Sequence, residues 1–175
     1  MANVLLSAKN IEIRFGGVIA ADGINLDVLE GENLAIIGPN GAGKTTFLNI
    51  STGYLRPQGG TVTFLGQDIT AQLPRTIVKL GIARAFQIPQ LFLDQTVMEN
   101  MLIAAASRRG HPSGLRALST MPEAPEMERL LDLVGVKSYA QRTARELPEG
   151  QRKLVDIALA LALKPKLLLM DEPTS

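Results

Sequence analysis

The chain has 175 residues, of which 46% are hydrophobic and 20% charged, a composition typical of a soluble globular domain. The formal net charge is +1, so no overall positive field indicates nucleic acid as a partner. Cysteine is absent, which excludes a disulfide framework and a thiolate metal site. The N-terminus lacks a signal-peptide pattern and no apolar run is long enough to cross a bilayer. We therefore expect a cytoplasmic chain that reaches a membrane only through a partner.

The first half of the chain is predicted to be rich in strands, because short apolar, β-branched runs alternate with Gly, Asp and Asn turns. A helix is expected from Lys44 to Ile50, and a shorter one from Pro74 to Leu80 that Gly81 stops. The expected strands are Leu5–Ala8, Ile11–Phe15, Ile24–Val28, Leu34–Ile37, Thr61–Leu65 and Ile82–Phe86.

After Gln87 the pattern becomes helical. Apolar residues at helical spacing predict helices over 97–106, 127–133 and 149–163, with a polar loop over 107–125. A buried strand over 166–170 follows. The expected organisation is an α/β core of residues 1–87 and 156–175, interrupted by a helical insert at 88–155. Because the last strand should be central in its sheet, we expect the chain to be part of a longer domain.

Residues 38–46 read G-P-N-G-A-G-K-T-T and match the phosphate-binding pattern G-x-x-x-x-G-K-[ST]. Glycines let successive N–H groups face one concavity, and the dipole of the following helix favours an anion there. A glycine turn without a ligand is the alternative, which the expected strand and helix on either side argue against. The predicted cradle consists of Gly38, Pro39, Asn40, Gly41, Ala42, Gly43, Lys44, Thr45 and Thr46. Lys44 is expected on the β- and γ-phosphates and the Thr45 hydroxyl on Mg²⁺.

A second candidate motif, which is acidic, follows the last expected strand. Asp171 ends the run L-L-L-M-D and is expected to hold Mg²⁺, while Glu172 follows as a candidate general base for an attacking water. Alone, two acids after a strand more often form a solvated turn. In one chain with Lys44 and Thr45 they indicate nucleotide hydrolysis.

In this order the segments resemble the nucleotide-binding subunit of an ATP-binding-cassette (ABC) transporter. The resemblance rests on five segments: Phe15-Gly16, 38–46, Phe86-Gln87, Leu147–Gln151 and Leu167–Glu172. It implies an α/β fold with a P-loop NTPase (RecA-like) core, an N-terminal antiparallel β-subdomain and an inserted α-helical subdomain. It also implies ATP and Mg²⁺ as cofactors.

The resemblance assigns roles to further residues. Phe15 would stack on adenine, and Gln87 would contact Mg²⁺ and the attacking water. Gly150 and Gln151, in the signature segment 147–151, would contact ATP bound to a second ATP-binding subunit, identical or different. The segment departs from the family pattern L-S-G-G-Q, because Pro148 lacks a hydroxyl and an N–H and Glu149 adds an acid. Pro148 is expected in the first helical turn, and Glu149 is expected to point away from phosphate.

Within this family, the chain resembles the ATPases of branched-chain amino acid importers. The segments that carry this closer resemblance are 15–23, 81–87, 91–92 and 96–100. Importers of urea or short amides share much of this pattern. The implied protein is an ATPase subunit, peripheral on the inner face of the plasma membrane. It would drive a membrane permease, be linked indirectly to a substrate-binding protein, and bind no nucleic acid.

The alternatives are a soluble ABC-type ATPase acting on DNA or ribosomes, and an unrelated P-loop GTPase or kinase. Long heptads and an N-K-x-D segment, typical of those alternatives, are absent from the sequence.

The sequence leaves two alternative roles for each of two groups of residues. The apolar residues Ile88, Leu91, Phe92 and Leu93 are predicted to receive a permease helix, or else to pack inside the helical insert. In the polar loop, His111 and the arginines 108, 109 and 116 are expected to be solvated, although the arginines could also contact lipid phosphates or the permease.

Overall fold

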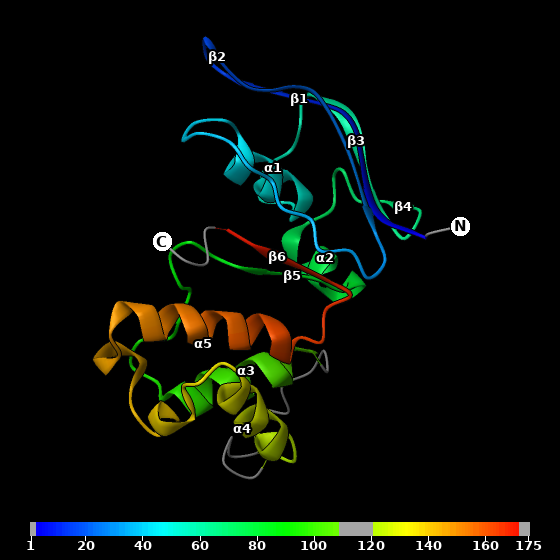
Figure 1. The fold of residues 1–175 in the computed structure, drawn as a ribbon. Coiled ribbons are helices and arrows are strands. Elements are labelled where there is room, and N and C mark those ends of the chain that lie inside the picture. The colour runs from blue at the N-terminus through cyan, green and yellow to red at the C-terminus, as the bar shows by residue number, and fades with distance from the viewer. Residues whose placement is uncertain (1–2, 109–120, 172–175) are drawn as a thin grey trace. The chain divides into compact units, whose positions relative to one another are not determined.

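A computed structural model describes residues 3–108 and 121–171 of the chain. The chain divides into two compact units, an N-terminal unit, Met1–Leu80, and a C-terminal unit, Gly81–Ser175 (Figure 1). In the described residues, no helix is both long and apolar enough to cross a membrane.

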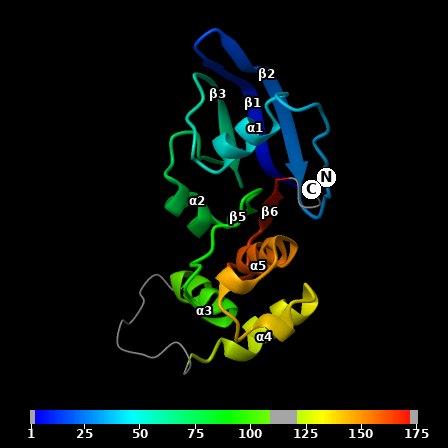
Figure 2. The same cartoon turned by 90° about the vertical axis from the view of Figure 1, so that its left-hand side faces the viewer.

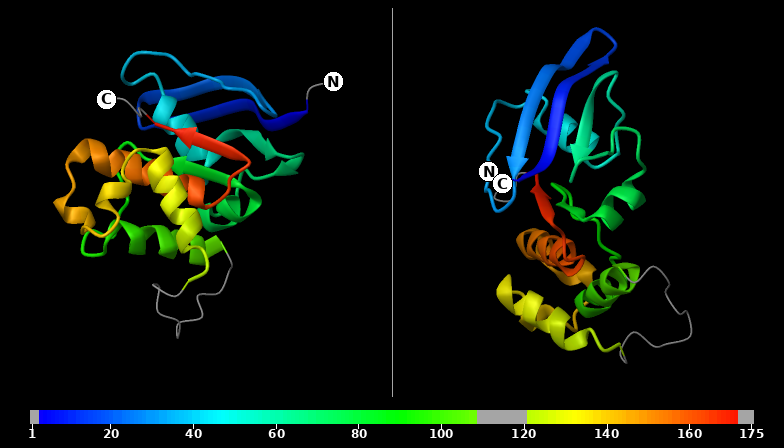
Figure 3. Two further views of the ribbon diagram at one scale, coloured as in Figure 1. Left: turned by 60° about the horizontal axis from the view of Figure 1, so that its bottom comes forward. Right: turned by 90° about the vertical axis from the view of Figure 1, so that its right-hand side faces the viewer.

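The N-terminal unit is built on an antiparallel sheet with strand order β2-β1-β3-β4. Figure 3 shows β2, β1 and β3 side by side in this order. The strands are β1 (Val4–Phe15), β2 (Val18–Leu29), β3 (Gly59–Phe64) and β4 (Gln67–Asp68). Most buried residues of β1 and β3 alternate with more exposed ones, because successive side chains of a strand point to opposite faces; the exception is the adjacent pair Leu5 and Leu6. The expected antiparallel subdomain is therefore present.

Strand β1 joins two segments that the sequence analysis separates. Asn10 has a φ of 51° and lies where the register with β2 shifts, between Ala8 and Ile11. Its N–H donates to the Oδ1 of Asn25 at 3.0 Å, so the irregular position keeps a hydrogen-bond partner. The strand thus continues through a bulge that has the composition of a turn.

Two helices complete the N-terminal unit. Helix α1 spans Lys44–Ser51 and buries Phe47, Leu48 and Ile50, and helix α2 spans Pro74–Leu80, as expected. Gly81 follows α2 with a φ of 114°, a conformation that favours glycine.

The predicted strand Leu34–Ile37 is wrong for this structure. The segment has no regular structure, and Leu34, Ile36 and Ile37 are 44%, 41% and 93% exposed. A strand forms only where a neighbour accepts and donates its backbone hydrogen bonds, and no described strand pairs with this segment. An apolar, β-branched sequence is therefore not sufficient for a strand here.

The C-terminal unit combines a parallel strand pair with helices. β5 (Ile82–Ala85) pairs in parallel with β6 (Leu167–Met170). Figures 1 and 2 show α5 (Glu149–Ala162) between this pair and the helices α3 (Val97–Arg108) and α4 (Ala124–Leu133). Short 3-10 helices, η2 (Lys137–Tyr139) and η3 (Ala144–Glu146), connect α4 to α5.

The helices enclose one apolar cluster, which includes Met101, Leu131 and Val155 at 0% exposure. A smaller cluster of Ala83, Ala85 and Ala160 packs α5 onto β5, where small side chains allow a close approach. The expected helices are confirmed within a few residues. The finer division into a core of 1–87 and 156–175 and an insert of 88–155 stays a prediction. Arg109, His111 and Arg116 lie outside the described residues.

Candidate nucleotide-binding site

The phosphate loop precedes helix α1 and turns through two glycines in the left-handed region, Gly41 (φ 84°) and Gly43 (φ 82°). A Cβ on Gly43 would lie 2.2 Å from the backbone oxygen of Ala20 in β2, so the loop passes too close to the sheet for any side chain there. Gly38 is less confined, because a Cβ there would lie 3.1 Å from the Cβ of Ala42, a tight contact that a small adjustment would relieve. The glycines of the motif are thus explained by backbone geometry.

The end of α1 that faces the loop is electropositive. Gly43 is its N-cap and supplies no side-chain hydrogen bond, and the first turn contains no acid. The helix dipole is therefore not offset there by a carboxylate, and an anion would be favoured.

Lys44 places a cation at the same loop. Its Nζ donates to the backbone oxygens of Gly38 at 2.6 Å and of Pro39 at 3.0 Å. These bonds hold the ammonium group within the phosphate loop, and phosphate oxygens are a stronger class of acceptor than the two carbonyls. A cation beside a helix terminus without a side-chain cap fits the phosphates of a nucleotide.

Phe15 lies at the end of β1 and is 48% exposed. The backbone around it is open, because a Cβ on Gly16 or Gly17 would meet nothing within 4 Å. Core packing within the N-terminal unit therefore does not account for this aromatic ring.

In the C-terminal unit, Gln87 and Asp171 lie at one edge. They follow the paired ends of β5 and β6, Ala85 and Met170, and the carboxyl ends of parallel strands share an edge. Gln87 is exposed, whereas Asp171 is buried. Glu172 lies outside the described residues.

Asp171 is joined to a residue that the sequence analysis missed. The Nη2 of Arg84 lies 2.7 Å from the Oδ2 of Asp171, and the side chains are only 5% and 4% exposed. The guanidinium also lies over the ring of Phe86, 4.9 Å from its centroid. A carboxylate suits Mg²⁺ as a hard ligand, but this one would share its charge with Arg84. The available signal was a lone cation inside the apolar strand Ile82–Ala85.

A second missed residue is Asp156 in α5. It is 5% exposed, and its carboxylate accepts the N–H of Phe86 at 2.6 Å and the N–H of Gln90 at 3.3 Å. Burial raises the pKa of the Asp156 carboxyl above its ordinary value, and the two backbone N–H groups act against that rise. The signal was an acid on the buried stripe of α5, four residues before Ala160.

The signature segment begins helix α5. Leu147 is buried at 2% exposure, Pro148 is the N-cap with a φ of −57°, and the helix begins at Glu149. Pro148 thus directly precedes the helix, rather than lying in its first turn as the sequence analysis expects. A proline fits this position because its fixed φ suits a helix start. Glu149 and Gly150 are exposed and Gln151 is half-buried, so the first turn is open on one side.

Comparison with known proteins gives matches along most of the chain. The profile of the family described as ABC transporter matches residues 21–175. The chain is similar to the "High-affinity branched-chain amino acid transport ATP-binding protein LivG" of Escherichia coli (strain K12), with 35% identity over 182 residues, 100% of this chain and 71% of that protein. A protein of Archaeoglobus fulgidus with the name "Probable branched-chain amino acid transport ATP-binding protein LivG" is 40% identical over 173 residues, 97% of this chain and 67% of that protein.

A solved structure gives the same result for the fold. It shows the ADP conformation of an ATP-binding cassette of an ABC transporter and has a TM-score of 0.80 and 36% identity. The match covers 98% of this chain and 70% of that chain.

Proposed function

The chain belongs to the ABC transporter family, and from that premise we propose that it powers the import of branched-chain amino acids. It has the fold of a P-loop NTPase and is an ATP-binding, ATP-hydrolysing transporter subunit. The alternative of a soluble ABC-type ATPase acting on DNA or ribosomes is less well supported. The phosphate loop, where Lys44 and the helix end without a side-chain cap lie together, carries the ATP-binding part of the proposal. The cargo rests on the similarity to the branched-chain amino acid transport protein LivG.

We assign ATP binding to the loop first. The backbone N–H groups of residues 38–46 and the Nζ of Lys44 hold the phosphates, with Thr46 as a further donor. Lys44 exchanges its two carbonyl acceptors for phosphate oxygens. Phe15 stacks on adenine, which its exposure supports.

For hydrolysis, we assign Mg²⁺ to Thr45, Gln87 and Asp171. When bound, the metal would neutralise charge on the phosphates. Gln87 orients the attacking water and Glu172 accepts its proton. Arg84 keeps the buried Asp171 carboxylate fixed at the end of β6.

The partners follow from the family. We propose a homodimer or heterodimer with a second ATP-binding subunit, in which Gly150 and Gln151 approach ATP held by the partner. Membrane permease subunits complete the complex on the inner face of the plasma membrane, and a substrate-binding protein is linked only through them.

The permease would dock on the segment after β5. Ile88 and Phe92 are 74% and 60% exposed, and Leu93 is 37% exposed. Leu91 packs against the helical cluster instead. Of the four residues predicted for the dock, three thus supply exposed apolar surface and one anchors the segment.

Uptake of labelled leucine tests the cargo. Cells in which the natural gene is deleted, with other leucine importers removed, should regain uptake from the wild-type gene and from Lys79→Ala, but not from Lys44→Ala. Lys79 is an exposed lysine of α2 and controls for the loss of one positive charge. Normal leucine uptake in the deletion strain would reject the branched-chain cargo and leave the ATPase assignment intact.

A further inference from the structure

We propose that Asp156 is a positioning residue that fixes the backbone on both sides of Gln87 to helix α5, the helix that begins at the signature segment. This inference rests on the role of Gln87 proposed above. Asp156 is not among the residues assigned to ATP or Mg²⁺, and it acts through its hydrogen bonds to the loop that carries Gln87.

The two hydrogen bonds of Asp156 bracket Gln87. Each carboxylate oxygen takes one donor: Oδ2 accepts from the N–H of Phe86 at 2.6 Å, and Oδ1 accepts from the N–H of Gln90 at 3.3 Å. Within this span Pro89 has no N–H, and the Nε2 of Gln90 donates to the backbone oxygen of Ile88 at 3.1 Å. The short stretch 87–89 is therefore held at both ends by one side chain.

Burial makes this contact strong. A carboxylate at 5% exposure is costly unless its oxygens are satisfied, and backbone N–H groups bound to a charged acceptor form stronger bonds than those to a neutral one. The position of Asp156 is itself fixed, because Ala160, one turn along α5, packs against Ala83 and Ala85 of β5. The loop is thus tied to a helix that cannot shift locally without disturbing the strand.

The chain after Gln90 is held by separate contacts, to α3 and to η3. Asn100 accepts the N–H of Phe92 at 2.9 Å and donates to its carbonyl at 3.0 Å. The N–H of Ala144 donates to the carbonyl of Gln95, and that of Arg145 to the carbonyl of Leu93, at 2.9 and 3.0 Å. Residues 144 and 145 lie just before the signature segment. The segment that follows the Gln87 loop is therefore held by α3 and by the residues just before the signature segment.

Amide hydrogen exchange, resolved to single residues in the complete natural polypeptide, tests the contact. In the wild type, the amides of Phe86 and Gln90 should be protected like those of α5. In Asp156→Asn, one oxygen is replaced by an NH₂ group, so at least one of the two amides should exchange about tenfold faster or more. Unprotected Phe86 and Gln90 amides in the wild type would overturn the proposal, whether or not the variant folds.

A double-mutant cycle tests the action on Gln87. Asp156→Asn should lower ATP turnover roughly tenfold with unchanged ATP affinity, and should have no further effect in a Gln87→Ala background. Asp132→Asn, an exposed acid of α4, is the matched control and should change neither quantity. Equal losses from Asp156→Asn in both backgrounds would overturn the positioning role. Full turnover in Gln87→Ala alone would instead reject the proposed role of Gln87, and the exchange result would then decide whether Asp156 holds the loop.

Discussion

The phosphate loop and the β5–β6 edge are organised in opposite ways. In the loop, glycine dihedral angles, main-chain contacts and one lysine bound to carbonyl oxygens determine the geometry. At the β5–β6 edge, buried charged side chains do so, through Arg84–Asp171 and through Asp156. The residues of the loop motif are consecutive in sequence, although Gly43 also lies close to the backbone of Ala20. The side chains of the edge instead join residues 70 and 87 positions apart. Substitutions in the two regions should therefore destabilise the protein for different physical reasons.

The largest effect is expected from Arg84→Met. It keeps much of the side-chain volume but leaves the Asp171 carboxylate buried without its cation, which should cost about 3–5 kcal/mol of unfolding free energy. Denaturant titration of the wild-type and variant proteins would measure this change in unfolding free energy. A loss below about 1 kcal/mol would show that the edge does not depend on this ion pair.

The next largest effect is expected from Gly43→Ala. The added Cβ would meet the oxygen of Ala20 at 2.2 Å, and alanine would have to adopt the φ of 82°. The free energy of unfolding of the N-terminal unit should therefore fall by about 2–3 kcal/mol. Gly66→Ala is the matched control, because Gly66 has a φ of 76° but open space around it. It should cost only about 1 kcal/mol. Equal unfolding midpoints for the two variants would remove the close approach as the reason for glycine at 43.

A smaller effect is expected in the pH dependence of stability. Burial raises the pKa of Asp156 when folded, so the folded state holds this proton more tightly than the unfolded state. The contribution of Asp156 is then fully present below its unfolded pKa and declines as pH rises through the folded pKa. The unfolding free energy of wild type relative to Asp156→Asn should therefore fall as pH rises from the ordinary Asp value of 3.8.

Asp27 provides the contrast within the N-terminal unit. Hydrogen bonds from Ser7 and then Lys9 lower the pKa of Asp27 below its ordinary value. Its contribution is present above the unfolded pKa and is lost as pH falls through the folded pKa, so wild type compared with Asp27→Asn should show the opposite slope. If the difference in unfolding free energy changed with pH in the same direction for Asp156→Asn and Asp27→Asn, the causes assigned to the two pKa shifts would be contradicted.

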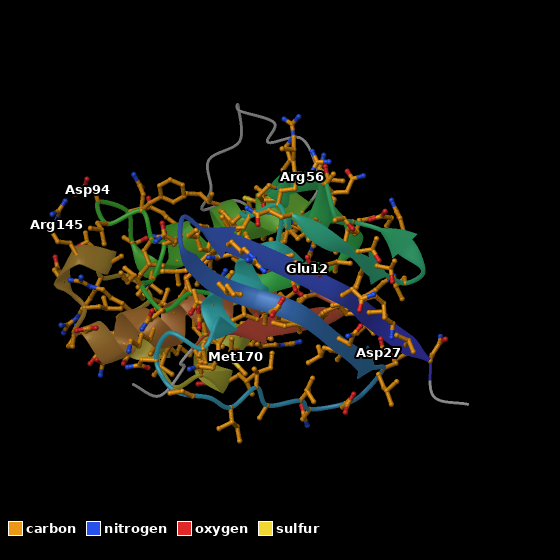
Figure 4. All side chains as sticks on the ribbon, turned by 90° about the horizontal axis from the view of Figure 1, so that it is seen from above. Glu12, Asp27, Arg56, Asp94, Arg145 and Met170 are labelled. Atoms are coloured by element: carbon orange, nitrogen blue, oxygen red, sulfur yellow. The ribbon has the colours of Figure 1, made fainter. Side chains whose placement is uncertain are left out.

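The smallest effect is expected at the ion pair between Asp94 and Arg145, whose side chains point toward each other in Figure 4. The N–O distance is 2.6 Å, yet the side chains are 82% and 63% exposed. Asp94→Asn should change the unfolding free energy by about 0.5 kcal/mol or less. A loss comparable to that of Arg84→Met would contradict the view that burial decides the strength of these pairs.

Local patterns were sufficient to predict much of the chain. Pro74 and Gly81 bounded α2, and helical spacing predicted α5 to within one residue of its observed end. The phosphate loop was predictable because its motif lies within nine consecutive residues, whereas the close approach of Gly43 to Ala20 of β2 was not predictable from that motif. The strand predicted at 34–37 failed because pairing depends on a partner elsewhere in the chain. Arg84 and Asp156 were missed for the same reason: their partners, Asp171 and Phe86, are close only after folding.

The assigned function requires that the loop at 38–46 binds the phosphates of ATP through Lys44. Equilibrium binding of a fluorescent ATP analogue to wild type, Lys44→Ala and Lys79→Ala tests this most directly. Lys44→Ala should weaken binding by at least about tenfold, while Lys79→Ala should match wild type. Equal affinity in all three proteins would contradict the assignment of the phosphate loop.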